Sequence, residues 1–368
     1  MWISLSGSTI RRPAARALGL ACVVTACVFL GCGKRGYAPS TEDWADSAGY
    51  DPHIQWSRDL GRAVEFSPVS TDHGWLVVFT DNKLLHVARD DGEILWKQKL
   101  SAAPSAGPVL LAGRVFVATD FPRPRLAGFD LDTGDTHWEI EVSAVHLVAG
   151  TDTLFTLENP GWLSALDPHT GDDLWSVPVI GAGPGAPILV GDVLVAPVRP
   201  DSLVAVNRSD GSRRWGIRPG WQPEIAASGS RIHASTVDSV LLAIDSRDGS
   251  VLQWADLPGR PVGPPVIRES VLYQALTDGR VVAASTATLE VLWISSQDAP
   301  LVSSPAVFGD RVAQAGPRGR VVLLRASDGV EIVRIRHPER VLASPVFHDG
   351  QLVLGGSGGT VIAYRENP

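Results

Sequence analysis

The sequence predicts an all-β protein: an eight-bladed β-propeller of four-stranded antiparallel blades, closed by the N-terminal strand joining the C-terminal blade. Three observations lead to this prediction. The composition favours short strands and tight turns, since 37 of the 368 residues are Gly and 27 are Pro, whereas Met occurs once. A tryptophan-marked unit repeats about every 40 residues, and the two ends of the chain hold complementary parts of one unit.

Seven tryptophans mark the repeat. Their successive steps are 40, 42, 37, 40, 39 and 39 residues, and a further step of 40 residues reaches Val333. In four copies a Gly stands four residues before the Trp, where it provides the positive φ that a tight hairpin turn needs. We expect a structural role for these side chains, on the last strand of each blade and packed against the next blade. The seven are Trp56, Trp96, Trp138, Trp175, Trp215, Trp254 and Trp293.

Each copy contains four short β-type segments. Apolar residues alternate with small or polar ones in pieces of four to seven residues, which predicts four strands per copy. One four-stranded sheet cannot bury both of its faces alone, so the copies must stack face to face, and radial closure of such blades gives a propeller. A proline opens the first strand of six copies, a position where its missing N–H is tolerated: Pro68, Pro108, Pro187, Pro265, Pro305 and Pro345.

The ends of the chain complete one blade. After Val333 the sequence predicts three strands, at 341–347, 351–355 and 359–364. The fourth strand of that copy, with its Trp, occurs at 53–56. We therefore expect the N-terminal strand to join the C-terminal blade and to leave no open sheet edge. Seven tryptophans and Val333 make eight markers and hence eight blades.

The N-terminal segment predicts export. Residues 1–31 combine a basic start with an apolar stretch too short for a comfortable membrane span, which is typical of a lipoprotein-type signal peptide. The residues before Cys32 resemble a bacterial lipobox, so we expect lipidation at Cys32. Lipidation at Cys27, an ordinary signal peptide and an uncleaved anchor are the alternatives. Residues 32–52 are polar and predict a flexible tether that would hold the propeller, 53–368, ~25 Å from the membrane.

Charge and composition exclude several classes of function. The formal net charge of −8 offers no electrostatic basis for binding nucleic acid. All three cysteines lie within the first 32 residues and the nine histidines are scattered, so we expect no metal site. No nucleophile or nucleotide motif occurs either. The sequence therefore predicts a protein without catalytic residues and without a cofactor.

The turn that precedes the Trp resembles a known repeat. The pattern Asp-x-x-Thr-Gly-x-x-x-Trp at 130–138 and at 167–175 resembles the quinoprotein-type (PQQ-like) propeller repeat. Together with the lipobox, it makes the chain similar to the BamB-like lipoproteins over roughly residues 53–364. This resemblance implies a non-catalytic scaffold of the outer-membrane β-barrel assembly machinery. Such a scaffold would be a lipid-anchored monomer in a hetero-complex, would face the periplasm and would bind other envelope proteins.

Two alternatives stay open beside this interpretation. Quinoprotein dehydrogenases share the repeat, and the resemblance to them implies pyrroloquinoline quinone, an adjacent Cys pair and a calcium ion. No Cys pair occurs in the predicted propeller, although four acidic residues could line its axis: Asp120, Glu158, Asp238 and Asp278. The second alternative is an unrelated envelope propeller. The loops that align with the docking loops of the BamB family, 177–183 and 218–223, lack that family's Leu/Arg and acidic residues.

Five residues form the predicted partner-binding set. Loops that lead into the innermost strands share one face of a propeller, and loops are where binding residues concentrate. Arg62, Arg260 and Arg340 precede opening prolines by five or six residues, so three blades would present a guanidinium suited to a carboxylate or an acidic loop. Arg218 and Trp221 belong to an aligned docking loop. Solvated rim arginines and burial of the aromatic ring between blades are the alternatives.

Overall fold

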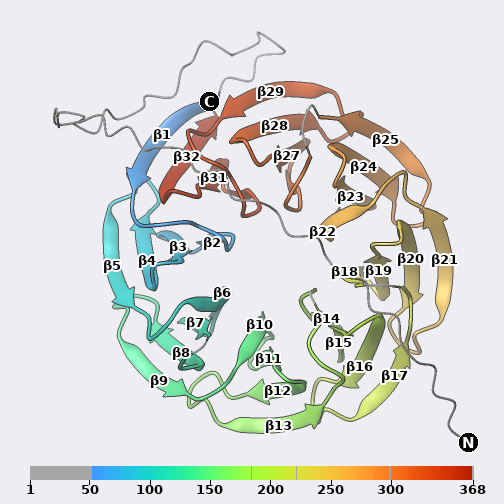
Figure 1. Ribbon diagram of the computed structural model, residues 1–368, viewed down its shortest axis with the longest axis horizontal. Helices are drawn as coiled ribbons and strands as arrows, with labels where there is room; N and C mark the ends of the chain where they lie inside the picture. The colour runs from blue at the N-terminus through green and yellow to red at the C-terminus, as the bar shows by residue number, and fades with distance from the viewer. Residues whose placement is uncertain (1–51, 121, 184, 221, 298–299, 367–368) are drawn as a thin grey trace, which may run out of the picture. The chain divides into compact units, whose positions relative to one another are not determined.

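Eight sheets surround a central axis. The computed structural model describes residues 52–366 except 121, 184, 221 and 298–299. The described residues form eight four-stranded antiparallel sheets, with the first strand of each sheet nearest the axis and the fourth at the rim (Figure 1). This arrangement confirms the predicted eight-bladed propeller. Within the described part of the chain, no helix has the length and apolar character needed to cross a membrane.

Seven blades, I to VII, each consist of four consecutive strands. Blade I consists of β2 (Val69–Ser70), β3 (Gly74–Phe79), β4 (Lys83–Ala88) and β5 (Ile94–Lys99). Blade II consists of β6 (Pro104–Leu111), β7 (Arg114–Thr119), β8 (Arg125–Asp130) and β9 (Thr136–Ile140). Blade III consists of β10 (Ala144–Ala149), β11 (Leu154–Glu158), β12 (Trp162–Leu166) and β13 (Asp173–Pro178). Blade IV consists of β14 (Ile188–Val190), β15 (Val193–Val198), β16 (Ser202–Asn207) and β17 (Arg213–Ile217). Blade V consists of β18 (Glu224–Ser228), β19 (Arg231–Ser235), β20 (Val240–Asp245) and β21 (Val251–Asp256). Blade VI consists of β22 (Pro261–Arg268), β23 (Val271–Leu276), β24 (Arg280–Ser285) and β25 (Val291–Ser296). Blade VII is β26 (Ala306–Phe308), β27 (Arg311–Ala315), β28 (Arg320–Arg325), β29 (Glu331–Arg336).

Blade VIII joins the two ends of the chain. It contains β30 (Val346–His348), β31 (Gln351–Gly355) and β32 (Thr360–Glu366), and its rim strand is β1 (Pro52–Asp59). β1 runs antiparallel to β32 from the pair Pro52↔Glu366 to the pair Asp59↔Thr360. In Figure 1 the blue β1 lies beside the red β32. The predicted closure by the N-terminal strand is therefore confirmed.

Tryptophans of the rim strands connect neighbouring blades. The ring of Trp96 lies against the backbone of Gly134 in the next blade, where an added Cβ would come within 2.7 Å of the ring. The indole N–H donates to the carbonyl of Leu131 in the same turn, at 2.7 Å. Gly134 therefore provides both the positive φ of the turn and the flat surface for the indole. The arrangement recurs for Trp56 with Gly92, Trp138 with Gly171, Trp175 with Gly211, Trp215 with Gly249 and Trp293 with Gly329.

Trp254 differs from the expected role, because it is 67% exposed. Gly249 precedes it by five residues, so the residue four positions after the glycine is Gln253. Gln253 pairs with Ala243 immediately beside the bulge, at the register that the tryptophan holds in other blades. A shift of one residue turns a strand side chain to the opposite side of the sheet. Trp254 therefore points to solvent rather than to blade VI.

Blade VI compensates for the missing indole. Leu289 stands where the other turns have glycine, and it is 2% exposed. Its side chain packs in the apolar cluster between blades V and VI, in the place that an indole fills elsewhere. His233 lies in line with Ala243 and Gln253 across blade V. At the position of His233, three other blades have an aromatic residue whose ring packs on the tryptophan of that blade: Phe116, Phe155 and Tyr273.

The turns at one end of the ring are strongly acidic. We call the end with the blade-to-blade connections the crossover face, and the other end the opposite face. Turns between first and second strands and between third and fourth strands lie on the opposite face, and their basic residues are Arg89, Arg208 and Arg247. Acidic residues outnumber these in the same turns: Asp72, Asp90, Asp91, Glu93, Asp132, Asp135, Asp152, Asp167, Asp172, Asp192, Asp210, Asp248, Glu269, Glu290, Asp310, Asp328 and Asp349.

The tryptophan contacts predict a contrast between two alanine substitutions. Trp96→Ala should lower the free energy of unfolding by ~3–5 kcal/mol, because it removes a buried ring and the partner of the Leu131 carbonyl. The matched control Trp254→Ala removes an exposed ring and should change stability by less than about 1 kcal/mol. Urea unfolding followed by tryptophan fluorescence measures both. Equal losses for the two variants would contradict the structural role of the buried ring.

Candidate functional site

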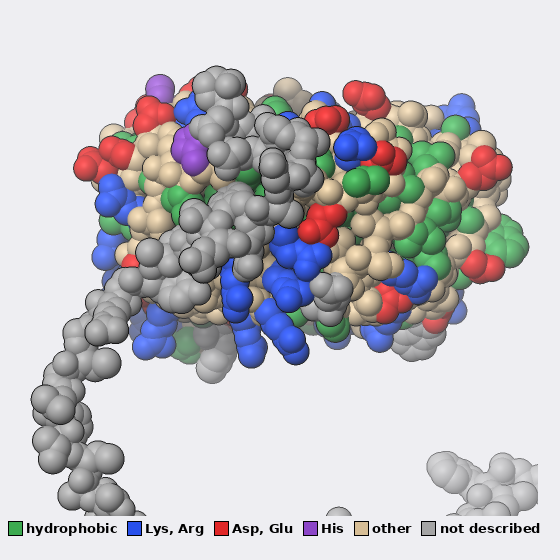
Figure 2. Space-filling view, turned by 90° about the horizontal axis from the view of Figure 1, so that it is seen from above, with side chains coloured by type: hydrophobic (Ala, Val, Ile, Leu, Met, Phe, Trp, Pro, Cys, Tyr) green, Lys and Arg blue, Asp and Glu red, His purple; other side chains and the backbone are tan. Residues whose placement is uncertain are grey.

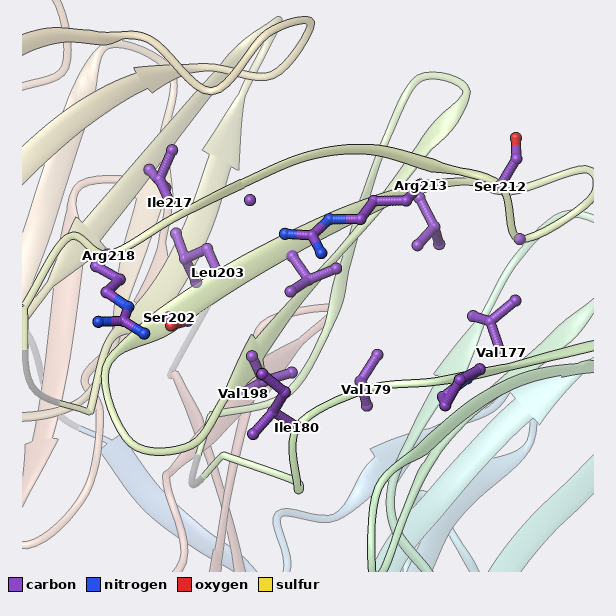
Figure 3. A pocket seen from close by; sticks show the side chains of 15 residues that line it. Val177, Val179, Ile180, Val198, Ser202, Leu203, Ser212, Arg213, Ile217 and Arg218 are labelled. Atoms are coloured by element: carbon purple, nitrogen blue, oxygen red, sulfur yellow. The ribbon is translucent and has the colours of Figure 1, made fainter.

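A groove of about 660 Å³ opens between blades III and IV. One wall comes from β13 and the loop that follows it, and the other from β16 and β17. In Figure 3, Val179 and Ile180 lie on one side of the groove and Leu203 and Ile217 on the other. The guanidinium group of Arg213 extends along it. The groove therefore combines apolar walls with cationic groups, as many protein-binding surfaces do.

The groove depends on two local features. Gly216 has no side chain, and the guanidinium group of Arg213 occupies the space that a Cβ would take, so the arginine can lie along β17. On the other wall the chain reverses at Gly181, whose φ is 65° and whose N–H donates to the carbonyl of Val179 at 3.0 Å. This reversal places Ile180 at the tip of the loop, where it is 76% exposed. Because Ile180 adjoins Val179 and Leu203 in the same groove, it belongs to a contiguous apolar surface, which is typical of an interaction site.

Arg218 lies at the crossover end of this groove. Its Nε is 3.8 Å from Oδ1 of Asp201, and its side chain is largely exposed. An exposed pair at that distance contributes little, so the guanidinium group remains available to a partner. The groove extends from Arg218 to Gly211 and Ser212 in a turn of the opposite face. It therefore follows the rim of the ring from one face to the other.

The other residues of the predicted set do not converge on this groove. Arg62, Arg260 and Arg340 are exposed on the crossover face, as expected from their loops. Arg340 and Arg62 lie on consecutive crossovers, into blades VIII and I, whereas Arg260 lies on the crossover into blade VI. The arginines therefore follow an arc of the face rather than a single site. Trp221 and Cys32 lie outside the described residues.

Glu224 is a buried acid that the sequence does not predict. It begins β18, after the crossover that contains Arg218, and its carboxylate packs against the backbone of Gly185. Burial raises the pKa of the Glu224 carboxyl to about 7. A lone Glu between Pro223 and Ile225 has no pattern that distinguishes it from a solvated loop acid. Its environment comes from the neighbouring blade IV.

The acids considered for a calcium site are dispersed. Asp120, Glu158, Asp238 and Asp278 belong to four different blades. Asp278 is paired with Arg280, and Glu158 accepts a hydrogen bond of 2.6 Å from Thr156. Within the ranges that the structure describes, no group of three or more His, Cys, Asp or Glu residues could hold a metal ion. These residues do not fit a calcium-bound quinone.

Comparisons with known proteins agree with the repeat. A family model described as outer membrane protein assembly factor BamB matches residues 49–204, 200–306 and 278–367. The BamB protein of Bordetella pertussis is 24% identical over 344 residues, which cover 87% of this chain and 88% of that protein.

Two solved structures share the fold. The crystal structure of BamB from Moraxella catarrhalis superposes with a TM-score of 0.74 at 16% identity, covering 86% of this chain and all of that chain. A quinohemoprotein alcohol dehydrogenase from Comamonas testosteroni superposes with a TM-score of 0.72 at 13% identity, covering 85% and 76%. At these identities the likeness shows the fold alone.

The buried acid predicts a pH-dependent stability. The folded state binds the Glu224 proton more tightly than the unfolded state, because burial raises the pKa to about 7 from ~4.3 in the unfolded chain. The contribution of this group to the free energy of unfolding is therefore fully present below pH ~4.3 and is lost as the pH rises through about 7. Glu224→Gln should therefore raise the free energy of unfolding by ~1–3 kcal/mol at pH 8, and by little at pH 4. Urea unfolding of both proteins at the two pH values measures the difference. A variant that gains equally at both values would contradict the burial of this carboxyl.

Proposed function

Because the chain belongs to the family of outer membrane protein assembly factor BamB, we propose that it is a non-catalytic envelope scaffold in outer-membrane β-barrel assembly. In this proposal the propeller holds partner proteins on its loops and rim. A closed ring of eight blades presents a large and rigid surface, which suits binding by area rather than by chemistry.

The groove between blades III and IV is the observation that carries the proposal. Its two walls begin in the loops that align with the docking loops of the family, and its tip residue Ile180 is exposed. An aliphatic anchor beside Arg218 can bind a partner that offers an apolar side chain and a carboxylate. The specific Leu/Arg and acidic residues of the family are absent from these loops, where Ile180 and Arg218 supply an exposed apolar side chain and a cation.

The proposed location is the outer membrane, on the side that faces the periplasm. The supporting observations are the lipobox-like sequence before Cys32 and the polar segment 32–52. The names of the relatives agree with an outer-membrane role. A lipid anchor followed by a tether would keep the propeller near nascent barrels while leaving it free to turn.

Capture of the partner tests the proposed site. Crosslinking and affinity purification from native membranes should recover the barrel-forming subunit, and Ile180→Asp combined with Arg218→Ala should reduce its recovery at least ~10-fold. The control Leu174→Asp changes an exposed aliphatic residue of β13 that does not line the groove, and it should leave recovery unchanged. Undiminished recovery with the double variant would disprove the groove as the docking site. Recovery of unrelated proteins only would disprove the assembly role.

Lipidation is tested separately. Cys32→Ser should move the protein from the membrane fraction to the soluble periplasmic fraction, because it removes the acceptor of the lipid. Mass spectrometry of the wild-type protein should show acyl groups on an N-terminal Cys32. Cys27→Ser is the matched control and should remain membrane-bound. If Cys27→Ser is released and Cys32→Ser is not, lipidation is at Cys27.

A further inference from the structure

Four arginines form a basic surface at the crossover face of blades VII and VIII. We call Arg62, Arg318, Arg336 and Arg340 the basic patch; all four are exposed. Arg318 lies in the turn between β27 and β28, and Arg336 ends β29. Arg340 and Arg62 lie on the crossovers before and after blade VIII. Figure 2 shows Lys and Arg side chains gathered at the lower edge of this side of the ring.

Little negative charge offsets the patch locally. On the two crossovers, 337–345 and 60–68, the acidic residues are Glu339 and Glu65. Glu339 is half-buried, and its carboxylate accepts hydrogen bonds of 2.6 Å from the backbone N–H of Gly358 and from the hydroxyl of Thr360. Its charge is therefore directed into the blade rather than toward solvent. Glu65 and Asp59, which ends β1 just before the second of these loops, are exposed, so two acidic side chains stand against four arginines.

Exposed aliphatic side chains lie on the same face. Leu342, two residues after Arg340, is 36% exposed, and Val302 on the preceding crossover is 39% exposed. Basic groups together with exposed apolar side chains are the combination that peripheral membrane proteins use at the headgroup boundary. A partner that offered carboxylates alone would leave the apolar side chains unused.

We propose that the basic patch docks on an anionic phospholipid surface, where its guanidinium N–H groups donate hydrogen bonds to the oxygens of the headgroup phosphates. The patch is spread over separate loops of two blades, and the large groove lies elsewhere, between blades III and IV. A spread of charge without a cavity fits an extended surface better than a single acidic segment. The acidic turns of the opposite face would be repelled by the same surface, so the ring would approach the membrane with its crossover face.

This docking goes beyond the proposed scaffold role and is compatible with it. The patch belongs to blades VII and VIII, four blades away from the groove between blades III and IV, so a ring that tilts onto the patch leaves Ile180 and Arg218 accessible to a partner. The lipid anchor would supply attachment, and the patch would set the orientation of the ring. Attachment and orientation can therefore be lost separately.

Vesicle cosedimentation of an anchor-free protein tests the patch. Residues 33–368 contain every strand that closes the ring, since β1 begins at Pro52 and β32 ends at Glu366. The test variant carries Arg318→Gln, Arg336→Gln and Arg340→Gln. The control variant makes the same charge change on the opposite face, with Arg208→Gln, Arg247→Gln and Arg268→Gln. Urea midpoints confirm that both variants fold.

We expect the wild-type protein to bind phosphatidylcholine vesicles with about 30% phosphatidylglycerol at least ~10-fold more strongly than pure phosphatidylcholine at ~50 mM salt. The patch variant should lose at least ~10-fold, whereas the control should stay within about threefold of the wild type. Equal losses in both variants would overturn the proposal in favour of net charge alone. An absence of vesicle binding, with a crosslinked protein lost only in the patch variant, would overturn it in favour of an acidic protein. Capture through the groove is measured independently, so either proposal can fail alone.

Discussion

The contact between an indole and a turn glycine is the constraint on which the ring depends. The same glycine supplies a positive φ and a surface without a side chain, and its turn supplies the carbonyl that accepts the indole N–H. This contact is made at the rim, where neighbouring blades are farthest apart. It therefore fixes the angle between blades without using the crossovers, which are free to carry binding residues.

The repeat predicts the fold well because both members of this contact are visible in the sequence. The structure also explains why the eighth marker is Val333 and not a tryptophan. The next blade has no turn between its third and fourth strands, since β32 and β1 come from opposite ends of the chain, and so no glycine surface exists for an indole there. The expectation for Trp254 shows the limit of spacing as a guide. Its step of 39 residues fits the period, but a one-residue offset decides which side of the strand it occupies.

The candidate site was less predictable because its parts come from different blades. Ile180 and Arg213 are far apart in sequence, and neither belongs to a pattern, yet both line the groove. The loop positions of Arg62 and Arg340 predict exposure on one face. That Arg336 joins them follows only from strand pairing, which sets Arg336 opposite Arg320 at the crossover end of blade VII. Spacing along the chain identifies repeats, whereas a surface is assembled from positions that do not repeat.

The closing blade links the order of synthesis to the finished ring. Among the strands that the structure describes, β1 is the first to be synthesised, and β32, its partner, is the last. Until β32 has been synthesised, β1 lacks its hydrogen-bonded neighbour, and the blade that contains Trp56 is incomplete. Local hairpins can form early, but closure must wait for a contact that spans the whole propeller. A chain that stops short of β32 consequently retains unpaired strand edges, the feature that promotes association with other chains.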